Sequence, residues 1–353
     1  MPTINNVIRT ASACTGGARS FRIRDMVARQ RGEFVASVRA NVSLCREHYR
    51  LVLTLSQFPA SEPGQFVQIL CREPDEDETI AREVDWEGES PLDATGRELL
   101  GPLAYLARPF SLAGRRDTTG AVELEFIHRV VGIGTEWLAR LQVGDRVRLL
   151  GPLGNRFALP AEDELAILIG GGVGIPPMLY LAGKLAGRRA VAFCGALSRD
   201  LLPLTIEGEP GVPGPDSLEP LMNVAEFSRH GISAVLSTDD GSYGFRGFVT
   251  QTLERFLDSL SPRLRVSASP RPVLYTCGPE PMMKRVAEIA AERGLECQVA
   301  VERAMACGMG TCQSCCIRVR KADPAKAPLV GSDWCWRLAC TDGPIFRGAD
   351  LLW

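Results

Sequence analysis

The cysteines near the end of the chain have a spacing that suits a metal cluster. Cys307, Cys312 and Cys315 are separated by four and then by two residues. This is the spacing of three thiolate ligands in plant-type [2Fe–2S] proteins, where a fourth cysteine follows later. Gly308 and Gly310 would let backbone amides approach the sulfur atoms. The alternative is a zinc site, but zinc ribbons usually pair two Cys-x-x-Cys knuckles and this segment has one, so the pattern favours an iron–sulfur cluster.

The position of the fourth ligand stays open on spacing alone. Cys316, Cys335 and Cys340 all follow the first three cysteines. Cys316 adjoins Cys315 directly, so its side chain is expected to point the other way. Six of the 12 cysteines lie in the last 47 residues, whereas a secreted disulfide scaffold spreads its pairs through a small domain. We therefore expect a reducing compartment and a cytoplasmic protein.

A glycine-rich turn further back in the chain suits a nucleotide. It follows the apolar run 165–169 and precedes a predicted helix over 176–185. Glycines at such a turn let backbone N–H groups approach a phosphate at the positive end of the helix. A proline fits the first helical turn, where its missing N–H costs little. The expected nucleotide-binding residues are Gly170, Gly171, Gly172, Gly174 and Pro176.

Two segments before this turn could hold a second nucleotide. Arg108-Pro109-Phe110-Ser111 offers a guanidinium for a pyrophosphate, an aromatic ring and a hydroxyl on one extended stretch. Gly132-Ile133-Gly134-Thr135 opens a predicted helix over 136–141 and is again suited to a phosphate. Two such anion sites and a separate nucleotide turn indicate one bound cofactor and one diffusible nucleotide.

The elements that must position these residues fall into two kinds. From 33 to 160, short β-rich runs broken by Pro-Gly and Gly-Asp pairs predict a small antiparallel barrel. An insert over 72–100 with 11 acidic and 3 basic residues interrupts it. From 161 to 300, apolar strands alternate with helices, which predicts a parallel α/β domain. Residues 301–353 form the cluster segment, and residues 1–32 are expected to be a disordered extension.

Composition excludes some partners. The formal net charge is −2, which gives no long-range attraction to nucleic acid or to a membrane surface. No stretch approaches 18 consecutive apolar residues, so no membrane span is expected. Three histidines, His48, His128 and His230, give no case for a Ser–His–Asp site.

Taken in order, these motifs resemble the ferredoxin–NADP reductase superfamily, and within it the family of electron-transfer subunits of dihydroorotate dehydrogenase B. The likeness runs from about residue 33 to 346, apart from the acidic insert. It is carried by the motifs above and by six further segments: Pro63–Phe66, Gly151–Gly154, Asp239–Ser242, Cys277–Pro279, Met305–Gly308 and Cys340–Phe346.

The resemblance implies FAD in the barrel, NAD in the α/β domain (NADP is the alternative) and a [2Fe–2S] cluster in the last segment. It implies that Arg108 binds the pyrophosphate and that Ser111 lies near the reactive nitrogen of the flavin. It also implies that Cys277 lies near the nicotinamide and that Cys340 is the fourth cluster ligand. The remaining implied FAD contacts are Pro109, Phe110, Ile127, His128, Arg129, Gly134 and Thr135, with His128 standing where the family commonly has tyrosine.

The family also implies a function and a partner. A catalytic, FMN-containing subunit would oxidise dihydroorotate in pyrimidine biosynthesis, and this chain would pass the electrons to NAD within a heterotetramer. Related modules serve ferredoxin–NADP transhydrogenases and sulfhydrogenases, and these are the first alternative. A non-catalytic regulatory relative that uses the fold for binding is the second.

Overall fold

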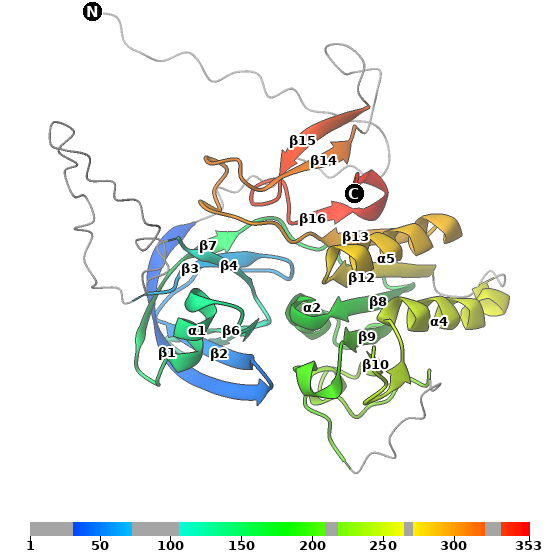
Figure 1. Ribbon diagram of the computed structural model, residues 1–353, viewed down its shortest axis with the longest axis horizontal. Helices are drawn as coiled ribbons and strands as arrows, with labels where there is room; N and C mark the ends of the chain where they lie inside the picture. Colours follow the sequence, from blue (N-terminus) through cyan, green and yellow to red (C-terminus); the bar gives the residue numbers. More distant parts are fainter. Residues whose placement is uncertain (1–30, 73–105, 209–217, 265–270, 322–332) are drawn as a thin grey trace, which may run out of the picture.

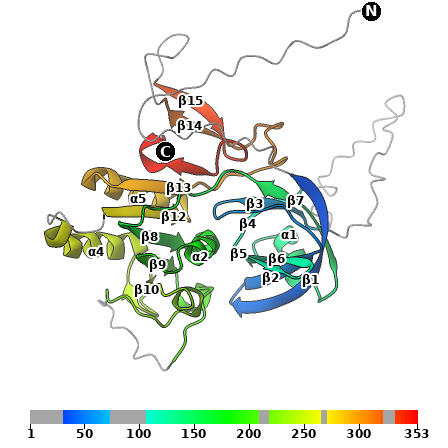
Figure 2. The same cartoon turned by 180° about the vertical axis from the view of Figure 1, so that it is seen from behind.

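The computed structural model describes residues 31–72, 106–208, 218–264, 271–321 and 333–353. Two large sheets lie side by side, and the end of the chain lies across both (Figures 1 and 2). The predicted extension before residue 31 and most of the acidic insert lie outside the described residues. No helix in the described segments is both long and apolar enough to cross a membrane.

The first sheet is built from seven antiparallel strands in the order β4-β3-β7-β1-β2-β6-β5. Leu112 and Ala113, both buried, are the only residues between its two edge strands. One bent segment therefore pairs with β3 and then with β6, which curls the sheet into a barrel, as predicted. The strands are β1 (Gly32–Cys45), β2 (His48–Leu55), β3 (Phe66–Leu70), β4 (Arg108–Ser111), β5 (Gly114–Thr118), β6 (Ala121–Arg129) and β7 (Arg146–Leu153), with α1 (Ile133–Arg140) before β7.

The second sheet follows the order β11-β10-β9-β8-β12-β13-β16. Its pairs are parallel except that β16 runs antiparallel to β13. The parallel α/β prediction is confirmed, and β16, from the predicted cluster segment, joins one edge of the sheet. The strands are β8 (Glu164–Gly171), β9 (Ala190–Ala196), β10 (Ser233–Thr238), β11 (Phe245–Arg246), β12 (Arg271–Cys277), β13 (Glu296–Ala300) and β16 (Ile345–Arg347).

Helices cover both faces of this sheet because its central strands are apolar on both sides. Leu168 of β8 packs with α2 (Ile175–Lys184) and α3 (Ala225–Ser228), on the face toward the barrel. Ile167 and Ile169 of the same strand pack on the other face with α4 (Val249–Leu264) and α5 (Glu280–Arg293). Strand order reverses around β8, which places a ligand-binding crevice at the carboxyl ends of the central strands.

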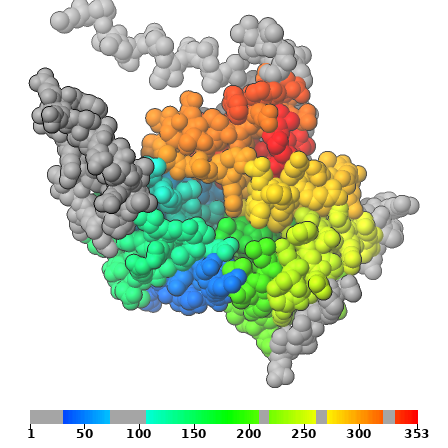
Figure 3. Space-filling view, in the orientation of Figure 1, coloured from blue at the N-terminus to red at the C-terminus, as the bar shows by residue number. Residues whose placement is uncertain are grey.

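The end of the chain crosses from the second sheet to the barrel and back. After β13 it passes over the barrel, forms the hairpin β14 (Cys316–Arg320) and β15 (Trp334–Leu338), and returns as β16. Figure 3 shows this orange and red part lying across the top of the two sheets. Asn155, just after β7, holds the segment that leads back into β16. Its amide donates to the carbonyls of Asp342 (2.9 Å) and Ile345 (2.8 Å), and its Oδ1 accepts from the Ile345 N–H (2.8 Å).

Candidate functional site

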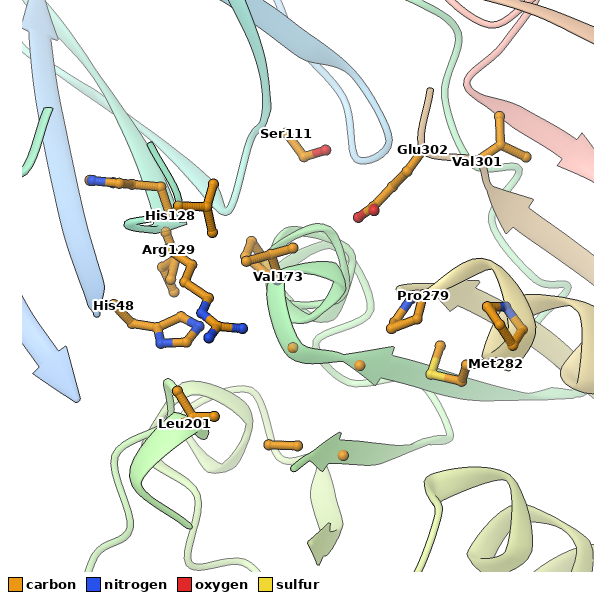
Figure 4. A pocket seen from close by; sticks show the side chains of 18 of the residues that line it. His48, Ser111, His128, Arg129, Val173, Leu201, Pro279, Met282, Val301 and Glu302 are labelled. Carbon is orange, nitrogen blue, oxygen red and sulfur yellow. The ribbon is translucent and has the colours of Figure 1, made fainter. Parts of the chain in front are cut away.

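One large pocket lies between the barrel and the carboxyl edge of the α/β sheet. Its volume is about 1120 Å³, and residues from both sheets and from the segment after β13 line it. Figure 4 shows side chains from the barrel on one wall and from the glycine turn and α5 on another. A cavity of this size, walled mainly by apolar groups with a few polar ones, suits a large planar cofactor and a second ligand.

The barrel wall contains most of the residues predicted to contact FAD. These are Pro109, Phe110, Ser111, Ile127, His128, Arg129 and Thr135. Arg108 is the exception among the side chains. It is exposed, lies outside the pocket wall, and donates from Nη1 to the carbonyl of Leu106 (2.8 Å). The Thr135 hydroxyl already accepts from the N–H groups of Val131 (2.9 Å) and Gly132 (3.2 Å), so it shapes the turn that opens α1. Gly134 is buried beneath that turn.

The glycine turn divides into residues that face the pocket and residues that permit packing. Gly171, Gly172 and Pro176 line the pocket. Gly170 and Gly174 do not: a Cβ on Gly174 would lie 2.2 Å from the carbonyl oxygen of Cys277, and one on Gly170 would lie 2.9 Å from Cα of Ile175. Gly172 has open space around it but a φ of +52°, a conformation that glycine adopts without strain. Of the predicted nucleotide-binding glycines, Gly171 and Gly172 are therefore the two that face the pocket, and their binding of a phosphate stays a prediction.

Cys277 is buried at the end of β12, where its backbone pairs with Gly170 and Ala300. Its side chain is 3% exposed and is not part of the pocket wall. Burial raises the pKa of this thiol, with a smaller contribution from Glu302. Cys277 thus stands as a neutral group just behind the wall, and its predicted place near the nicotinamide stays a prediction.

Glu302 is a pocket residue that the sequence analysis did not single out. It follows β13 and points into the same space as Ser111, from the opposite side (Figure 4). Surrounding protein raises the pKa of its carboxyl by desolvation. Its position two residues after a buried parallel strand, at the edge where ligands bind, is the signal that could have identified it.

The cysteine loop begins where the pocket wall ends. Met305 lines the pocket, and Cys307 follows two residues later. The N–H groups of Met309 and Cys312 donate to Cys307 Sγ at 3.5 and 3.4 Å. Gly308 and Gly310 have φ values of +68° and +93°, which allow the tight loop that aims these amides at sulfur. Amides directed at thiolate sulfur suit an iron–sulfur cluster, whose reduction potential depends on hydrogen bonds to its sulfur atoms.

The four predicted ligand cysteines lie together as two neighbouring pairs. The thiol of Cys312 lies beside Cys307, and the thiol of Cys340 beside Cys315. No three His, Cys, Asp or Glu side chains of the described segments converge on the position of a single ion. Two pairs of thiols suit a two-iron cluster, which takes four cysteines in all.

The other two candidates for the fourth ligand face elsewhere. Cys316 Sγ donates to the carbonyl of Gln313 (2.9 Å). Cys335 lies within β15, where it pairs with Val319. The end of the hairpin that adjoins the cysteine loop is the Cys316–Leu338 pair, three residues further along β15. Cys340, in contrast, is buried next to the loop, and the N–H of the preceding Ala339 donates to the Cys315 carbonyl (3.1 Å).

Comparison with known proteins places the chain among characterised families. Residues 302–352 match the family model of the iron–sulfur cluster binding domain of dihydroorotate dehydrogenase B. The chain is 32% identical over 296 residues to the dihydroorotate dehydrogenase B (NAD(+)) electron transfer subunit of Geobacillus thermodenitrificans, spanning 83% of this chain and 87% of that one. It is 34% identical over 250 residues to the subunit of Geobacillus kaustophilus, spanning 70% and 80%.

The chain belongs to the family of dihydroorotate dehydrogenase B electron-transfer subunits. A solved structure of an NADH-dependent reduced ferredoxin–NADP oxidoreductase has the same fold, with a TM-score of 0.61, 24% identity and 91% of each chain covered. The expected ferredoxin–NADP reductase architecture is therefore confirmed.

His128 is a buried histidine in the barrel wall of the pocket. Its ring is 2% exposed, stacks with Tyr49 at 5.8 Å between centroids, and lies edge-on to Phe110 at 6.2 Å. Neither ring nitrogen has a well-formed hydrogen bond with another described residue. Burial lowers the pKa of His128 to about 4, which the Thr135 backbone opposes only in part. A neutral ring at the pocket wall, whose nitrogens make no well-formed hydrogen bond to the described residues, fits contact with a bound cofactor.

The depressed pKa of His128 predicts a specific pH dependence of stability. The unfolded histidine titrates near 6.5, so between about pH 6.5 and pH 4 the unfolded chain binds more protons and the free energy of unfolding falls as pH falls. Over this whole pH range, protonation of the unfolded histidine lowers the free energy of unfolding by roughly 3 kcal/mol. We expect His128→Tyr to remove the His128 contribution to this slope, so that the slope becomes shallower in denaturant titrations at a series of pH values.

His230→Gln is the control, because His230 is partly exposed and is not part of the pocket wall. We expect this variant to keep most of the slope. An unchanged slope in His128→Tyr would show that His128 is not the buried neutral group.

Proposed function

We propose that the chain is the oxidoreductase subunit that carries electrons between a dihydroorotate-oxidising partner and NAD, by way of its own [2Fe–2S] cluster and FAD. The observation that carries this proposal is the continuity of the two sites. The pocket wall runs through Glu302 and Met305 directly into the cysteine loop at Cys307. Electron exchange needs its centres close together, and here one short segment contributes to both sites.

FAD fits the barrel side of the pocket. We propose that Pro109, Phe110 and Ser111 hold the flavin and that Ile127, His128 and Arg129 complete its site. Arg129 pairs with Glu47 (2.8 Å) at the pocket edge and keeps its guanidinium beside the wall. Gly134 and Thr135 shape the helix start that would receive a phosphate, and Arg108 would have to leave Leu106 to reach it. When bound, the flavin exchanges a hydride with the nicotinamide and single electrons with the cluster.

NAD fits the α/β side, at the glycine turn. Gly171 and Gly172 present their backbone to the pocket, with Asp239 at the end of β10 lining it nearby. An acidic residue beyond a parallel strand suits the ribose hydroxyls of NAD and opposes the 2′-phosphate of NADP. Arg199, the candidate for reading that phosphate, lies over the ring of Tyr243 at 5.5 Å and outside the pocket wall. We therefore propose NAD as the nucleotide, with Cys277 behind the nicotinamide.

The cluster site consists of Cys307, Cys312, Cys315 and Cys340. Their thiols must lose protons to bind iron, and the amides of Met309 and Cys312 stabilise the negative sulfur of Cys307. We propose an FMN-containing catalytic subunit as the partner, in a heterotetramer. Free thiols in this number suit the reducing cytoplasm.

The ligand assignment predicts unequal effects of three cysteine substitutions. Cys340→Ser should lose most of the protein-bound iron and the visible absorption of the cluster, because its thiol belongs to the paired set. Cys335→Ser and Cys316→Ser are matched controls from the same hairpin and should keep both. Iron and sulfide assays of anaerobically purified protein measure the cluster content of each variant. Loss of the cluster in Cys335→Ser alone would identify Cys335 as the fourth ligand.

Ser111→Ala should slow electron exchange with NADH. Loss of a hydroxyl that bonds to developing charge costs about 1.5–3 kcal/mol, or roughly tenfold to a hundredfold in kcat/KM. The assay is NADH-dependent reduction of a dye, corrected for FAD content. Ser61→Ala, whose hydroxyl contacts Tyr180 (3.3 Å) away from the pocket, is the control. Equal rates in Ser111→Ala and the parent protein would contradict the assigned role.

Co-expression with a dihydroorotate-oxidising flavoprotein subunit tests the whole proposal. We expect a stable complex that couples dihydroorotate oxidation to reduction of NAD+, and more slowly of NADP+. Cys340→Ser should abolish this coupling but preserve NADH–dye activity, since only the path from the partner crosses the cluster. A complex formed instead with a hydrogenase-like or glutamate-synthase-like chain, without dihydroorotate activity, would refute the proposal.

A further inference from the structure

Gln68 is a buried amide that the barrel itself does not satisfy. It lies in the middle of β3 and is 2% exposed. Neither Nε2 nor Oε1 has a hydrogen-bond partner among the described residues. Other buried glutamines differ: Gln298 donates to the Ala158 carbonyl (3.0 Å) and accepts from the Ala158 N–H (2.8 Å). An unpaired buried amide lowers the stability of the fold, so we expect Gln68 to have a hydrogen-bond partner outside the polypeptide.

The direction of the Gln68 side chain follows from the alternation of β3. Val67 and Ile69 belong to the barrel core, so Phe66 and Gln68 face outward. On the neighbouring strand, Ser111 pairs with Phe66 and Pro109 pairs with Gln68. Phe66, Pro109 and Ser111 line the pocket, whereas Gln68 lies just beyond its wall.

Beyond that wall, Gln68 meets the cysteine loop. A Cβ on Gly308 would lie 2.7 Å from Gln68 Cγ and 2.9 Å from Nε2, so the amide lies directly against the Gly308 backbone. Gly308 is the neighbour of Cys307, whose sulfur already accepts two backbone N–H groups from the loop itself. Gln68 is therefore a barrel side chain between the proposed flavin strand and the first ligand of the cluster.

We infer that the Gln68 side-chain amide donates a hydrogen bond to sulfur on the Cys307 side of the cluster and thereby raises its reduction potential. This inference rests on the proposed [2Fe–2S] site. Thiolate and sulfide sulfur only accept hydrogen bonds here, so Nε2 is the atom that faces them. Reduction adds negative charge to the cluster, and an N–H dipole stabilises the reduced form more than the oxidised form.

The test is the potential of the cluster in Gln68→Met, which keeps the length of the side chain and removes the amide. Holoprotein is equilibrated with a redox dye of known potential, and the cluster is followed by visible circular dichroism and by electron paramagnetic resonance. We expect the ratio of reduced to oxidised cluster to fall about threefold at a fixed dye potential, equivalent to about 28 mV for a one-electron couple. An unchanged ratio with an unchanged cluster spectrum would overturn the inference.

Gln298→Met is the matched control. It removes another buried amide, but one whose hydrogen-bond partners lie on Ala158 and not on the cysteine loop. We expect lower stability and an unchanged cluster potential. If Gln68→Met alters the spectrum and potential of the flavin and leaves those of the cluster unchanged, the amide serves the flavin and the inference is wrong.

A second measurement covers the case in which Gln68→Met loses its cluster. The protein is made by cell-free synthesis with ¹⁵N in the side-chain amides of its glutamines. Gln313, which lies between two of the ligand cysteines, is replaced by Asn so that it carries no label. The protein is then reduced and studied by pulsed electron paramagnetic resonance. We expect a ¹⁵N coupling to the cluster, and its absence would overturn the inference. Absence of iron and sulfide from the parent protein would instead refute the proposed function, so the two failures are distinguishable.

Discussion

The approach of the cysteine loop to the outer face of β3 is the contact on which the rest of the arrangement depends. Gly308 makes it possible, because a side chain there would collide with Gln68 and with Leu153, whose Cδ1 would lie 3.1 Å from a Cβ. Its positive φ also favours glycine. Without this approach, the cysteine loop and the barrel wall that lines the pocket would belong to separate parts of the molecule.

Segments distant in sequence hold the loop in that position. Asn155, at the exit from the barrel, binds the backbone on both sides of Gly343, and β16 then joins the edge of the α/β sheet. Gly154 allows Pro344 to pack closely, since a Cβ there would lie 2.5 Å from the proline Cδ. The barrel, the α/β sheet and the end of the chain are thus packed into one another, which keeps the pocket and the cysteine loop in fixed relation.

The two walls of the pocket differ in their polar groups. On the α/β side, Gly171 and Gly172 face the pocket, whereas close packing against Cys277 and Ile175 explains Gly174 and Gly170. On the barrel side, desolvation keeps His128 neutral. Across the pocket, after β13, desolvation raises the pKa of Glu302.

The sequence by itself determined what depends on local spacing. The 4–2 cysteine pattern, the glycine turn after an apolar run and the change from β-rich to alternating strand and helix each reside in a few neighbouring residues, and the barrel and α/β sheet follow. Tertiary structure decided what depends on contacts between distant segments. It brought Cys340 rather than Cys335 beside Cys315, added β16 to the sheet, turned Arg108 away from the pocket, and placed Glu302 and Gln68 at the two sites. No local pattern encodes these positions, because burial and strand register arise only when the sheets pack together.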